Sequence, residues 1–367
     1  MANKVMAAVA VAPKKTEIRE LDMPELTPDS GLLKIEAAGV CGSDWPMYQS
    51  ERPGPRILGH ENVGYIAKIG SEAAKRWGVK EGDRVALEEY LPCGHCRLCR
   101  SGEFRSCQAT DIFHNERAIR FGSTPLTVKP SLWGGYSQYL YLHPSTVIHK
   151  ISNHVPAEQA ALALPLSNGI EWAMIEGGVK SGKVVVIQGP GQQGLGCVVA
   201  AKTAGASCII VSGLTRDEQR LRVAKLLGAD YTVDAEKEDL LERVKEITGG
   251  EMADVSINVA SGSEVTIKNA IEVAKKRGTA VFAASNKKPL TSFNMDAVIS
   301  KHLTVKGVRG HSFDSVEMAI QAIESKAIPL AEMCTHHYGL EQVDEALRTV
   351  GGEINPGAIH VTVNPWS

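Results

Sequence analysis

The sequence predicts an α/β protein that combines a mostly β N-terminal domain with a doubly wound parallel-sheet domain. Residues 1–155 are short strand-like runs broken by Gly and Pro, a spacing typical of small barrel-like domains. Residues 156–305 alternate strands with helix-length segments, which predicts a parallel sheet with right-handed crossovers. Residues 306–367 return to mixed character. A chain of 367 residues is long enough for two domains with separate cores.

The strands of the N-terminal domain lead into two polar stretches. Met6–Val11, Leu32–Ala38 and Val63–Ile69 are the strand-like runs. Gly-Val-Cys-Gly-Ser-Asp at 39–44 follows the second run, and Leu-Gly-His-Glu-Asn at 58–62 precedes the third. Both stretches combine metal-binding residue types with carboxylates, so they are the first candidates for chemistry.

Cys41 and His60 are ligand types that Zn²⁺ prefers, and Glu61 offers an additional oxygen. Asp44 is a candidate for orienting the His60 ring through its second nitrogen. Ser43 is a candidate for passing a proton between a substrate hydroxyl and solvent. Taken singly, Cys41 as a small buried hydrophobe and His60 as a core histidine remain open alternatives.

Four cysteines gather in one short segment, Cys93, Cys96, Cys99 and Cys107, separated by two, two and seven residues. Four thiolates at this spacing predict a closed tetrahedral zinc site that holds the fold and performs no chemistry. Disulfides and an Fe–S cluster are the alternatives, and the short loops disfavour disulfides. His95 lies inside the loop and is not expected to be a ligand.

Composition excludes several classes of partner. Forty basic residues against 42 acidic ones give a net charge of −2, so there is no excess field for nucleic acid or an anionic membrane. No apolar run reaches the length of a spanning helix. The first 15 residues read as a strand and not as a signal peptide. Together with the clustered thiols, this predicts a cytoplasmic protein.

The second domain follows a strand–helix alternation from residue 156 onwards. An amphipathic helix is predicted to lead into it, and the strand of residues 183–188 is apolar and β-branched, as in a strand buried on both faces. Asp239–Ile247 is predicted to be a surface helix, and Ala358–Val363 a last strand beyond the domain. The remaining elements are predicted at Pro156–Met174 (helix), Cys208–Ser212 (strand), Asp217–Leu227 (helix), Asp254–Val259 (strand), Glu264–Lys276 (helix) and Ala280–Ala284 (strand).

A glycine-rich turn joins that buried strand to the next helix. Gly189, Gly191 and Gly194 form G-x-G-x-x-G in the strand–turn–helix context that the dinucleotide-binding motif requires. A pyrophosphate is stabilised at such a helix N-terminus by free N–H groups and by the helix dipole. A merely tight βα turn is the alternative. The expected cofactor contacts at this turn are Gly189, Gly191, Gln192, Gln193, Gly194 and Leu195.

These motifs carry a family resemblance that covers essentially the whole chain. It resembles the zinc-containing, medium-chain alcohol or polyol dehydrogenases of the sorbitol/threonine dehydrogenase type. The four-cysteine segment contributes to the resemblance. The other matching motifs are GVCGSD at 39–44, LGHENVG at 58–64, EGDRV at 81–85, GGYSQY at 134–139 and GPGQQGLG at 189–196.

The resemblance implies a GroES-like catalytic domain with a structural zinc lobe over 1–155 and a Rossmann domain over 156–305. It implies that 306–367 rejoin the catalytic domain. It also implies Cys41 and His60 as catalytic-zinc ligands. Glu61 would lie beside them, and Ser43 would begin a proton relay. We further expect a homo-oligomer, a dimer or a tetramer.

Three positions depart from the family pattern. The family's third zinc ligand, a Cys or Glu, falls at Leu164, which cannot ligate zinc. Either Glu61 completes a Cys–His–Glu site with water, or the catalytic zinc is weak or absent. A relay histidine is replaced by Pro46, so Ser43 must pass its proton to water or to a cofactor hydroxyl. Gly213 stands where an acidic residue ordinarily contacts the ribose.

The predicted function is zinc-dependent hydride transfer between a small alcohol, or its carbonyl, and a nicotinamide dinucleotide. A reductase of activated C=C bonds that lacks catalytic zinc is the alternative, and Leu164 is compatible with it. A non-catalytic zinc-binding protein on the same fold is a second alternative. Trp45 and Trp133 are candidates either for the substrate wall or for the core.

The cofactor is expected to be NADP or NAD, and the sequence favours NADP. Gly213 leaves room and brings no negative charge, while Thr215 and Arg216 follow it. A guanidinium at 216 suits a 2′-phosphate through charge-assisted hydrogen bonds. The alternatives are that Arg216 is a solvated residue before the helix, or that Asp217 or Glu218 turns a carboxylate towards the ribose.

Overall fold

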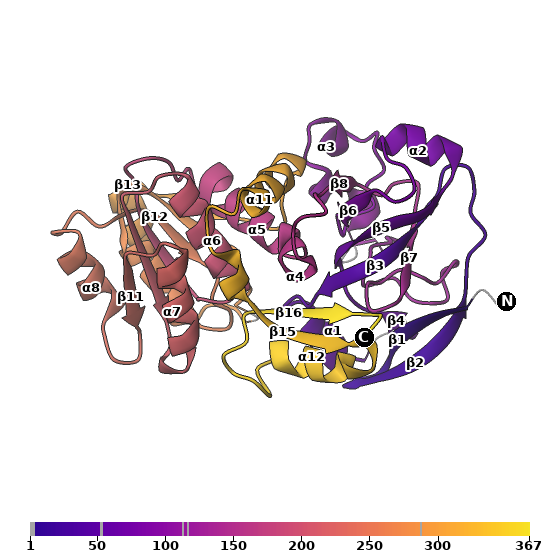
Figure 1. Cartoon of the computed structure of the whole chain (residues 1–367). Coiled ribbons are helices and arrows are strands. Elements are labelled where there is room, and N and C mark those ends of the chain that lie inside the picture. The colour runs from indigo at the N-terminus through magenta and orange to yellow at the C-terminus, as the bar shows by residue number, and fades with distance from the viewer. Residues whose placement is uncertain (1–3, 52–53, 112–113, 116, 287) are drawn as a thin grey trace. The chain divides into compact units, whose positions relative to one another are not determined.

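The computed structural model describes residues 4–51, 54–111, 114–115, 117–286 and 288–367, and they form two compact units (Figure 1). The first unit comprises Met1–Leu164 and Cys334–Ser367, and the second comprises Pro165–Met333. Within the described part of the chain, no helix is both long enough and apolar enough to cross a membrane.

The first unit is mostly β, as the sequence predicts. Its larger sheet has the order β15-β16-β3-β5-β6-β8 with β7 paired to β3, and its smaller sheet has the order β2-β1-β4. All of these pairings are antiparallel except that of β15 with β16. The strands are β1 (Lys4–Ala12), β2 (Lys15–Asp22), β3 (Gly31–Gly39), β4 (Arg56–Ile57), β5 (Glu61–Ile69), β6 (Arg84–Leu87), β7 (Tyr139–Leu142), β8 (Ile148–Lys150), β15 (Cys334–Gly339) and β16 (His360–Asn364).

Short helices connect these strands, and one apolar core unites the unit. Strands β1 and β3 supply Val5, Leu33 and Ile35 to that core, and Trp133 and Tyr136 add two large buried rings. The helices and 3₁₀ turns are α1 (Asp44–Gln49), α2 (Ser71–Trp77), α3 (Arg97–Arg100), η1 (Phe104–Ser106), η2 (Gln108–Thr110), α4 (Ala157–Ala160), η6 (Leu340–Gln342) and α12 (Val343–Val350).

The second unit contains a six-stranded, all-parallel sheet with the order β11-β10-β9-β12-β13-β14. Numbered from β9, this is the order 3-2-1-4-5-6 of dinucleotide-binding folds, whose switch point lies between β9 and β12. The strands are β9 (Val184–Gln188), β10 (Cys208–Gly213), β11 (Tyr231–Asp234), β12 (Ala253–Asn258), β13 (Ala274–Phe282) and β14 (Thr304–Gly307).

Helices connect these strands on both faces of the sheet. Because strand order reverses at β9, right-handed crossovers place α6 and α7 on one face and α8 and α9 on the other. The helical segments are α5 (Ala163–Ile170), the π-helical turn η3 (Glu171–Glu176), α6 (Gln192–Thr203), η4 (Thr215–Asp217), α7 (Glu218–Leu227), α8 (Leu240–Ile247), α9 (Glu264–Glu272), α10 (Met295–Lys301), α11 (Phe313–Ser325) and η5 (Leu330–Met333).

Two predicted helices need correction. The helix predicted over Pro156–Met174 is interrupted between α4 and α5 and ends in η3. Pro165 explains the interruption, because it lacks the N–H that a continuous helix would bond to Ala161 and its ring crowds that carbonyl. The helix predicted over Glu264–Lys276 ends at Glu272, because strand β13 already begins at Ala274.

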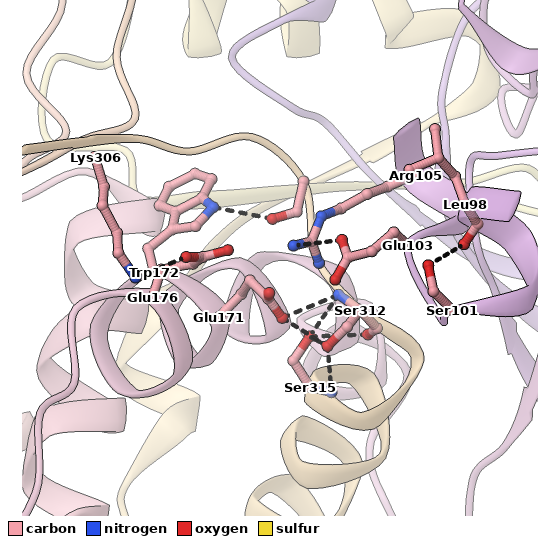
Figure 2. Close-up of polar contacts among 11 residues, drawn as sticks. Leu98, Ser101, Glu103, Arg105, Glu171, Trp172, Glu176, Lys306, Ser312 and Ser315 are labelled. Carbon is pink, nitrogen blue, oxygen red and sulfur yellow. Dashed lines mark hydrogen bonds and ion pairs between the residues drawn. The ribbon is translucent and has the colours of Figure 1, made fainter. Parts of the chain in front are cut away.

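The units change at 164/165 and 333/334, whereas the sequence analysis placed the domain boundaries at 155/156 and 305/306. Contacts within the second unit account for the later point at which the chain returns to the first unit. The Glu171 carboxylate accepts hydrogen bonds from the backbone N–H and the hydroxyl of Ser312, and the Trp172 indole donates to the Gly310 carbonyl (Figure 2). These bonds join the start of α11 to the segment after α5.

Candidate active site and metal centres

The pairing of β3 with β5 brings the two polar stretches together. Gly39, the last residue of β3, lies opposite Glu61, the first residue of β5. Cys41 follows one strand and His60 precedes the other, so the antiparallel register places them side by side. Gly39 has no room for a side chain, since an added Cβ would lie 2.4 Å from Glu61 Oε2. The site therefore depends on a close approach of two strand ends.

Cys41, His60 and Glu61 form a cluster whose ligand atoms all lie within 4.8 Å of one another. His60 and Glu61 are buried, and Cys41 is half-buried. Thiolate, imidazole and carboxylate donors form a set that suits Zn²⁺, with bond lengths of about 2.0–2.3 Å. The chain's own residues thus fit a zinc ion at this place. Leu164 is buried and offers no donor.

Asp44 fixes the geometry of this cluster. Its side chain is fully buried, and Oδ1 lies 3.3 Å from His60 Nδ1. Oδ2 accepts hydrogen bonds from the Cys41 backbone N–H (3.1 Å) and from the Tyr136 hydroxyl (2.8 Å). With Nδ1 turned to Asp44, His60 presents Nε2 to an ion, as metal-binding histidines ordinarily do.

The sequence analysis gave Tyr136 no role, although it lies inside the motif GGYSQY. Its side chain is completely buried and its ring approaches Gly59, where an added Cβ would lie 2.7 Å from the ring. Gly59 also has φ +89°, a conformation that favours glycine. The motif is the only sequence signal that pointed to this tyrosine.

Burial perturbs the acid–base properties of the cluster in the metal-free chain. It raises the pKa of the Cys41 thiol, and it raises the pKa of Glu61 to about 7. Burial lowers the pKa of His60, but the charge and hydrogen bond of Asp44 outweigh it, so the pKa of His60 is raised well above its usual value. Protons therefore occupy the site near neutral pH, and a cation that binds there must displace them.

The four cysteines of residues 93–107 lie in one lobe, where Cys107 is buried and the other three are half-buried. The Sγ–Sγ distances are 3.5 Å between Cys96 and Cys99, 3.9 Å between Cys93 and Cys99, and 3.9 Å between Cys96 and Cys107. Sulfurs bound to one tetrahedral zinc at about 2.3 Å lie about 3.8 Å apart. All four are free thiols, so the disulfide alternative finds no support.

Backbone N–H groups prepare this lobe for thiolates. The N–H groups of Cys93, Cys96 and Cys99 donate to Cys107, Cys93 and Cys96 sulfurs, respectively, at 3.4–3.5 Å. Hydrogen bonds from the N–H groups of His95 and Cys96 lower the pKa of Cys93 to about 6. His95 is exposed and turns Nδ1 to the Cys93 carbonyl (2.8 Å), away from a ligand role. An ion pair between Glu103 and Arg105 (3.1 Å; Figure 2) lies in the same lobe.

The glycine-rich turn of the second unit has the geometry that a phosphate requires. Gly189 has φ +102°, and Gly194 packs so closely that an added Cβ would lie 1.8 Å from the Gly189 carbonyl. Gly191 caps α6 in an extended conformation, and open space surrounds it. The first N–H groups of α6 therefore face a free approach at the carboxyl end of β9.

The other predicted residues of the turn differ in their exposure. Gln192 is buried, and Gln193 is half-buried with an Oε1 atom that has no partner among the described residues. Leu195 is fully buried, and its N–H donates to the Gly191 carbonyl (2.9 Å). Leu195 thus shapes the turn, and a direct cofactor contact by this residue stays a prediction.

The loop after β10 differs from the expectation that Gly213 leaves room for the cofactor. Gly213 does not leave free room, because an added Cβ would lie 2.8 Å from the ring of Pro190. Asp217 is buried and accepts from the Leu214 N–H (3.1 Å) and from Arg220 (3.0 Å), so its carboxylate is engaged inside the loop. Arg216 is exposed.

Two carboxylates beside this loop were missed by the sequence analysis. The Thr215 N–H donates to Glu236 (2.8 Å), and the Thr215 hydroxyl donates to Asp234 (2.7 Å). Lys237 lies 2.9 Å from Asp234 and offsets part of this negative charge. Asp234 ends β11 and Glu236 follows it, so the parallel pairing of β10 with β11 brings both acids to Thr215.

One of the two substrate-wall candidates belongs to the core. Trp133 is almost fully buried and its indole donates to the Val128 carbonyl (2.8 Å). Trp45 is half-buried and packs at 5.8 Å, between ring centroids, from Tyr48.

Comparisons with known proteins agree with this geometry. Residues 27–153 match the family model of the alcohol dehydrogenase GroES-like domain, and residues 194–325 match that of the zinc-binding dehydrogenases. A protein from Mycobacterium tuberculosis, named as a probable alcohol dehydrogenase, is 36% identical over 95% of both chains. A sorbitol dehydrogenase from Halalkalibacterium halodurans is 30% identical over 94% of both chains.

A solved structure from Sinorhizobium meliloti, named as a zinc-binding dehydrogenase and bound to NADP, superposes with a TM-score of 0.84. Its sequence is 26% identical, and the match covers 99% of each chain. The two family models together cover both kinds of domain, and the two relatives and this structure match nearly the whole chain. The chain therefore belongs to the zinc-type, medium-chain alcohol dehydrogenase family of oxidoreductases.

Proposed function

We propose that this protein oxidises a small alcohol, or reduces its carbonyl, with a nicotinamide dinucleotide, and that Cys41, His60 and Glu61 hold the catalytic zinc. The observation that carries the proposal is the convergence of these three ligand atoms within 4.8 Å. When bound, zinc supplies Lewis acidity that lowers the pKa of a substrate hydroxyl. The turn at Gly189–Gly194 holds the dinucleotide that accepts the hydride.

Asp44 and Ser43 serve the same reaction from the start of α1. Asp44 keeps the His60 ring oriented through Nδ1. Ser43 is exposed, and its side chain makes no capping bond to α1. Its hydroxyl is thus available to take the substrate's proton and deliver it to water, since Pro46 stands in the place of a relay histidine.

The test is to assay NAD⁺ and NADP⁺ reduction across a panel of primary, secondary and polyol alcohols, and to measure zinc per chain. Two zinc ions per chain and turnover of an alcohol are the expected results. One zinc per chain, with reduction of an activated C=C bond, would instead identify the zinc-free reductase.

Glu61→Ala isolates the role of the carboxylate ligand. We expect this variant to lose the second zinc and most of its activity while it keeps the zinc of the cysteine lobe. If Glu61→Ala retains both metals, Glu61 lies outside the coordination sphere and another ligand takes its place.

NADP is the proposed cofactor because position 213 carries no carboxylate and Arg216, the middle residue of η4, is exposed. In Arg216→Ala we expect KM for NADP to rise about tenfold, which corresponds to one exposed charge-assisted hydrogen bond, while KM for NAD stays constant. A preference for NAD that survives the substitution contradicts this choice.

We propose that the protein acts in the cytoplasm as a homo-oligomer. All eight cysteines are free thiols, as a reducing compartment maintains them. Strand β14 lies at the edge of the parallel sheet and exposes Val305, and the preceding helix α10 exposes Met295 and Ile299. An unpaired apolar sheet edge favours pairing with a second copy. Light scattering on wild type and on Val305→Lys tests this assignment, with the variant expected to shift towards monomer.

A further inference from the structure

We propose that Glu89 is a further carboxylate of the catalytic metal site and binds the same ion as Cys41 and His60. This inference rests on the proposed function, because it assumes zinc at that cluster. It adds to the site an oxygen that neither the glycine- and cysteine-rich motifs nor the family pattern indicates.

The register of β5 and β6 places Glu89 at the cluster. Asn62 pairs with Leu87 in an antiparallel ladder, and Val63 pairs with Ala86. Continued by two residues beyond the end of β6, this register sets Glu89 opposite His60. The strand that supplies Glu89 therefore flanks the one that begins at Glu61, on the side away from β3.

The distance between the two side chains is close to that of two ligands of one ion. Glu89 Oε2 lies 3.8 Å from His60 Nε2, the ring nitrogen that Asp44 leaves unused. Nitrogen and oxygen ligands at about 2.0–2.2 Å from one tetrahedral zinc lie about 3.4 Å apart. Glu89 is not one of the three residues whose ligand atoms all lie within 4.8 Å of one another, so its side chain must turn towards Cys41 and Glu61 to join them on one ion.

A buried arginine holds this carboxylate in place. Arg120 Nη1 lies 3.6 Å from Glu89 Oε1, the oxygen opposite the one that faces His60. Arg120 itself is fixed, because its Nε donates to the Thr110 hydroxyl (3.0 Å) and its guanidinium lies 4.6 Å from the centre of the Tyr90 ring. Only 5% of Arg120 is exposed. One oxygen of Glu89 is therefore anchored, and the other is directed at the cluster.

Glu89 also compensates for a ligand that this chain lacks. Position 164, where the family carries its third ligand, is a buried leucine. Glu61 is almost wholly buried, whereas the Glu89 side chain is 20% exposed. Glu89 is consequently the carboxylate nearer to solvent, and we assign to it the exchangeable position that a substrate oxygen takes over.

The experiment compares metal binding in wild type, Glu89→Gln and Glu36→Gln, each purified as the full-length, zinc-loaded chain. Glu36 is the matched control, because it also pairs with a buried arginine of this unit, Arg84 (2.7 Å), but unlike Glu89 it forms no ion pair with His60 among the described residues. Zinc per chain is titrated against a chelator of known affinity. Co²⁺ is then exchanged into the site, and its visible spectrum reports ligand number independently of activity.

We expect Glu89→Gln to weaken the affinity for the second zinc by at least tenfold and to change the Co²⁺ spectrum, while Glu36→Gln matches wild type. An unchanged affinity and spectrum in Glu89→Gln overturns the inference. So does an equal loss in Glu36→Gln, because the effect then comes from breaking an arginine pair. If Glu89→Gln does not fold, Glu89→Asp replaces it. This variant keeps the negative charge but withdraws the carboxylate oxygen from the metal cluster, so the same loss of zinc affinity is expected.

These outcomes separate the inference from the proposed function. If wild type binds a single zinc per chain, in the cysteine lobe, the proposed catalytic site itself fails and Glu89 has no ion to bind. If wild type binds two and Glu89→Gln keeps both with equal affinity, the proposed function stands and only the role of Glu89 is refuted.

Discussion

The two metal-binding clusters of this chain are built in opposite ways. The cysteine lobe draws all four ligands from residues 93–107, and three of its cysteines are half-buried near short helical turns. The second cluster takes Cys41 from the end of β3, and His60 and Glu61 from the start of β5. Its donors are held by Asp44 and Tyr136, which are fully buried.

In the cysteine lobe zinc stabilises the local structure, whereas at the second cluster the fold builds the site before zinc binds. In the lobe, the ligands come from loops and the short turns α3, η1 and η2, so zinc binding is itself folding energy. At the second cluster, the sheet positions the donors, and their raised pKa values keep protons on them near neutral pH. The donors are therefore in place before an ion binds, and the ion displaces their protons.

The largest effect is expected from Cys96→Ser, because Cys96 lies within 3.9 Å of two other sulfurs and caps α3. The variant should lose one zinc per chain, and its lobe should lose several kcal/mol of stability. Elemental analysis and limited proteolysis of the lobe measure both results. Cys208→Ser removes a half-buried thiol outside the clusters and should change neither. Unchanged zinc content in Cys96→Ser refutes the four-cysteine site.

The pH dependence of zinc binding should distinguish the second cluster. Burial raises the pKa of Glu61 to about 7, so below pH 7 its carboxyl holds a proton that zinc must displace. Affinity should therefore fall about tenfold per pH unit below 7 on account of Glu61 alone. Chelator competition between pH 5.5 and 8 measures the slope.

Glu61→Gln removes this proton, so the slope of log affinity against pH should decrease by one. In the lobe, the corresponding proton of Cys93 dissociates about one pH unit lower, because backbone hydrogen bonds lower the pKa of Cys93 to about 6. Equal slopes in wild type and Glu61→Gln contradict the protonated cluster.

The smallest effect is expected from Tyr136→Phe, which deletes the hydroxyl that donates to Asp44 (2.8 Å). Asp44 then loses one of its bonds, and the second zinc should bind about three- to tenfold more weakly, a loss of about 1 kcal/mol. The zinc of the lobe serves as the internal reference. Tyr141→Phe is the control, because the Tyr141 ring packs edge-on against Trp133 in the same unit. A loss in both variants would indicate a general packing effect.

The same contrast explains how much the sequence predicted. Short motifs or local periodicity indicate three features: the cysteine lobe, the turn at Gly189–Gly194 and the fold class. The sequence analysis also selected Cys41, His60 and Glu61, because their residue types suit zinc and the motifs resemble a known family.

Features that depend on pairing between distant segments were not predictable. Glu89 reaches the cluster through the register of β6, and no local signal marks it. Tyr136 reaches it through loop packing, and only the motif GGYSQY pointed to this residue. Asp234 and Glu236 reach Thr215 in the same way across parallel strands. The break before Pro165 is different, because the proline itself was a readable signal for it.

The order of strands in the first unit has a consequence for biosynthesis. Strand β16 pairs with the end of β3, Thr362 with Gly39, and the Val40 N–H donates to the Val361 carbonyl, beside Cys41. The whole second unit lies between these partners in the chain. At about 5–20 residues per second, a ribosome needs roughly 15–65 s to add the intervening ~320 residues. During that interval the edge of β3 next to Cys41 is uncovered, and near its end the contiguous second unit is complete. A nascent chain arrested before residue 360 therefore exposes an open strand edge that chaperones or a second nascent chain can pair with.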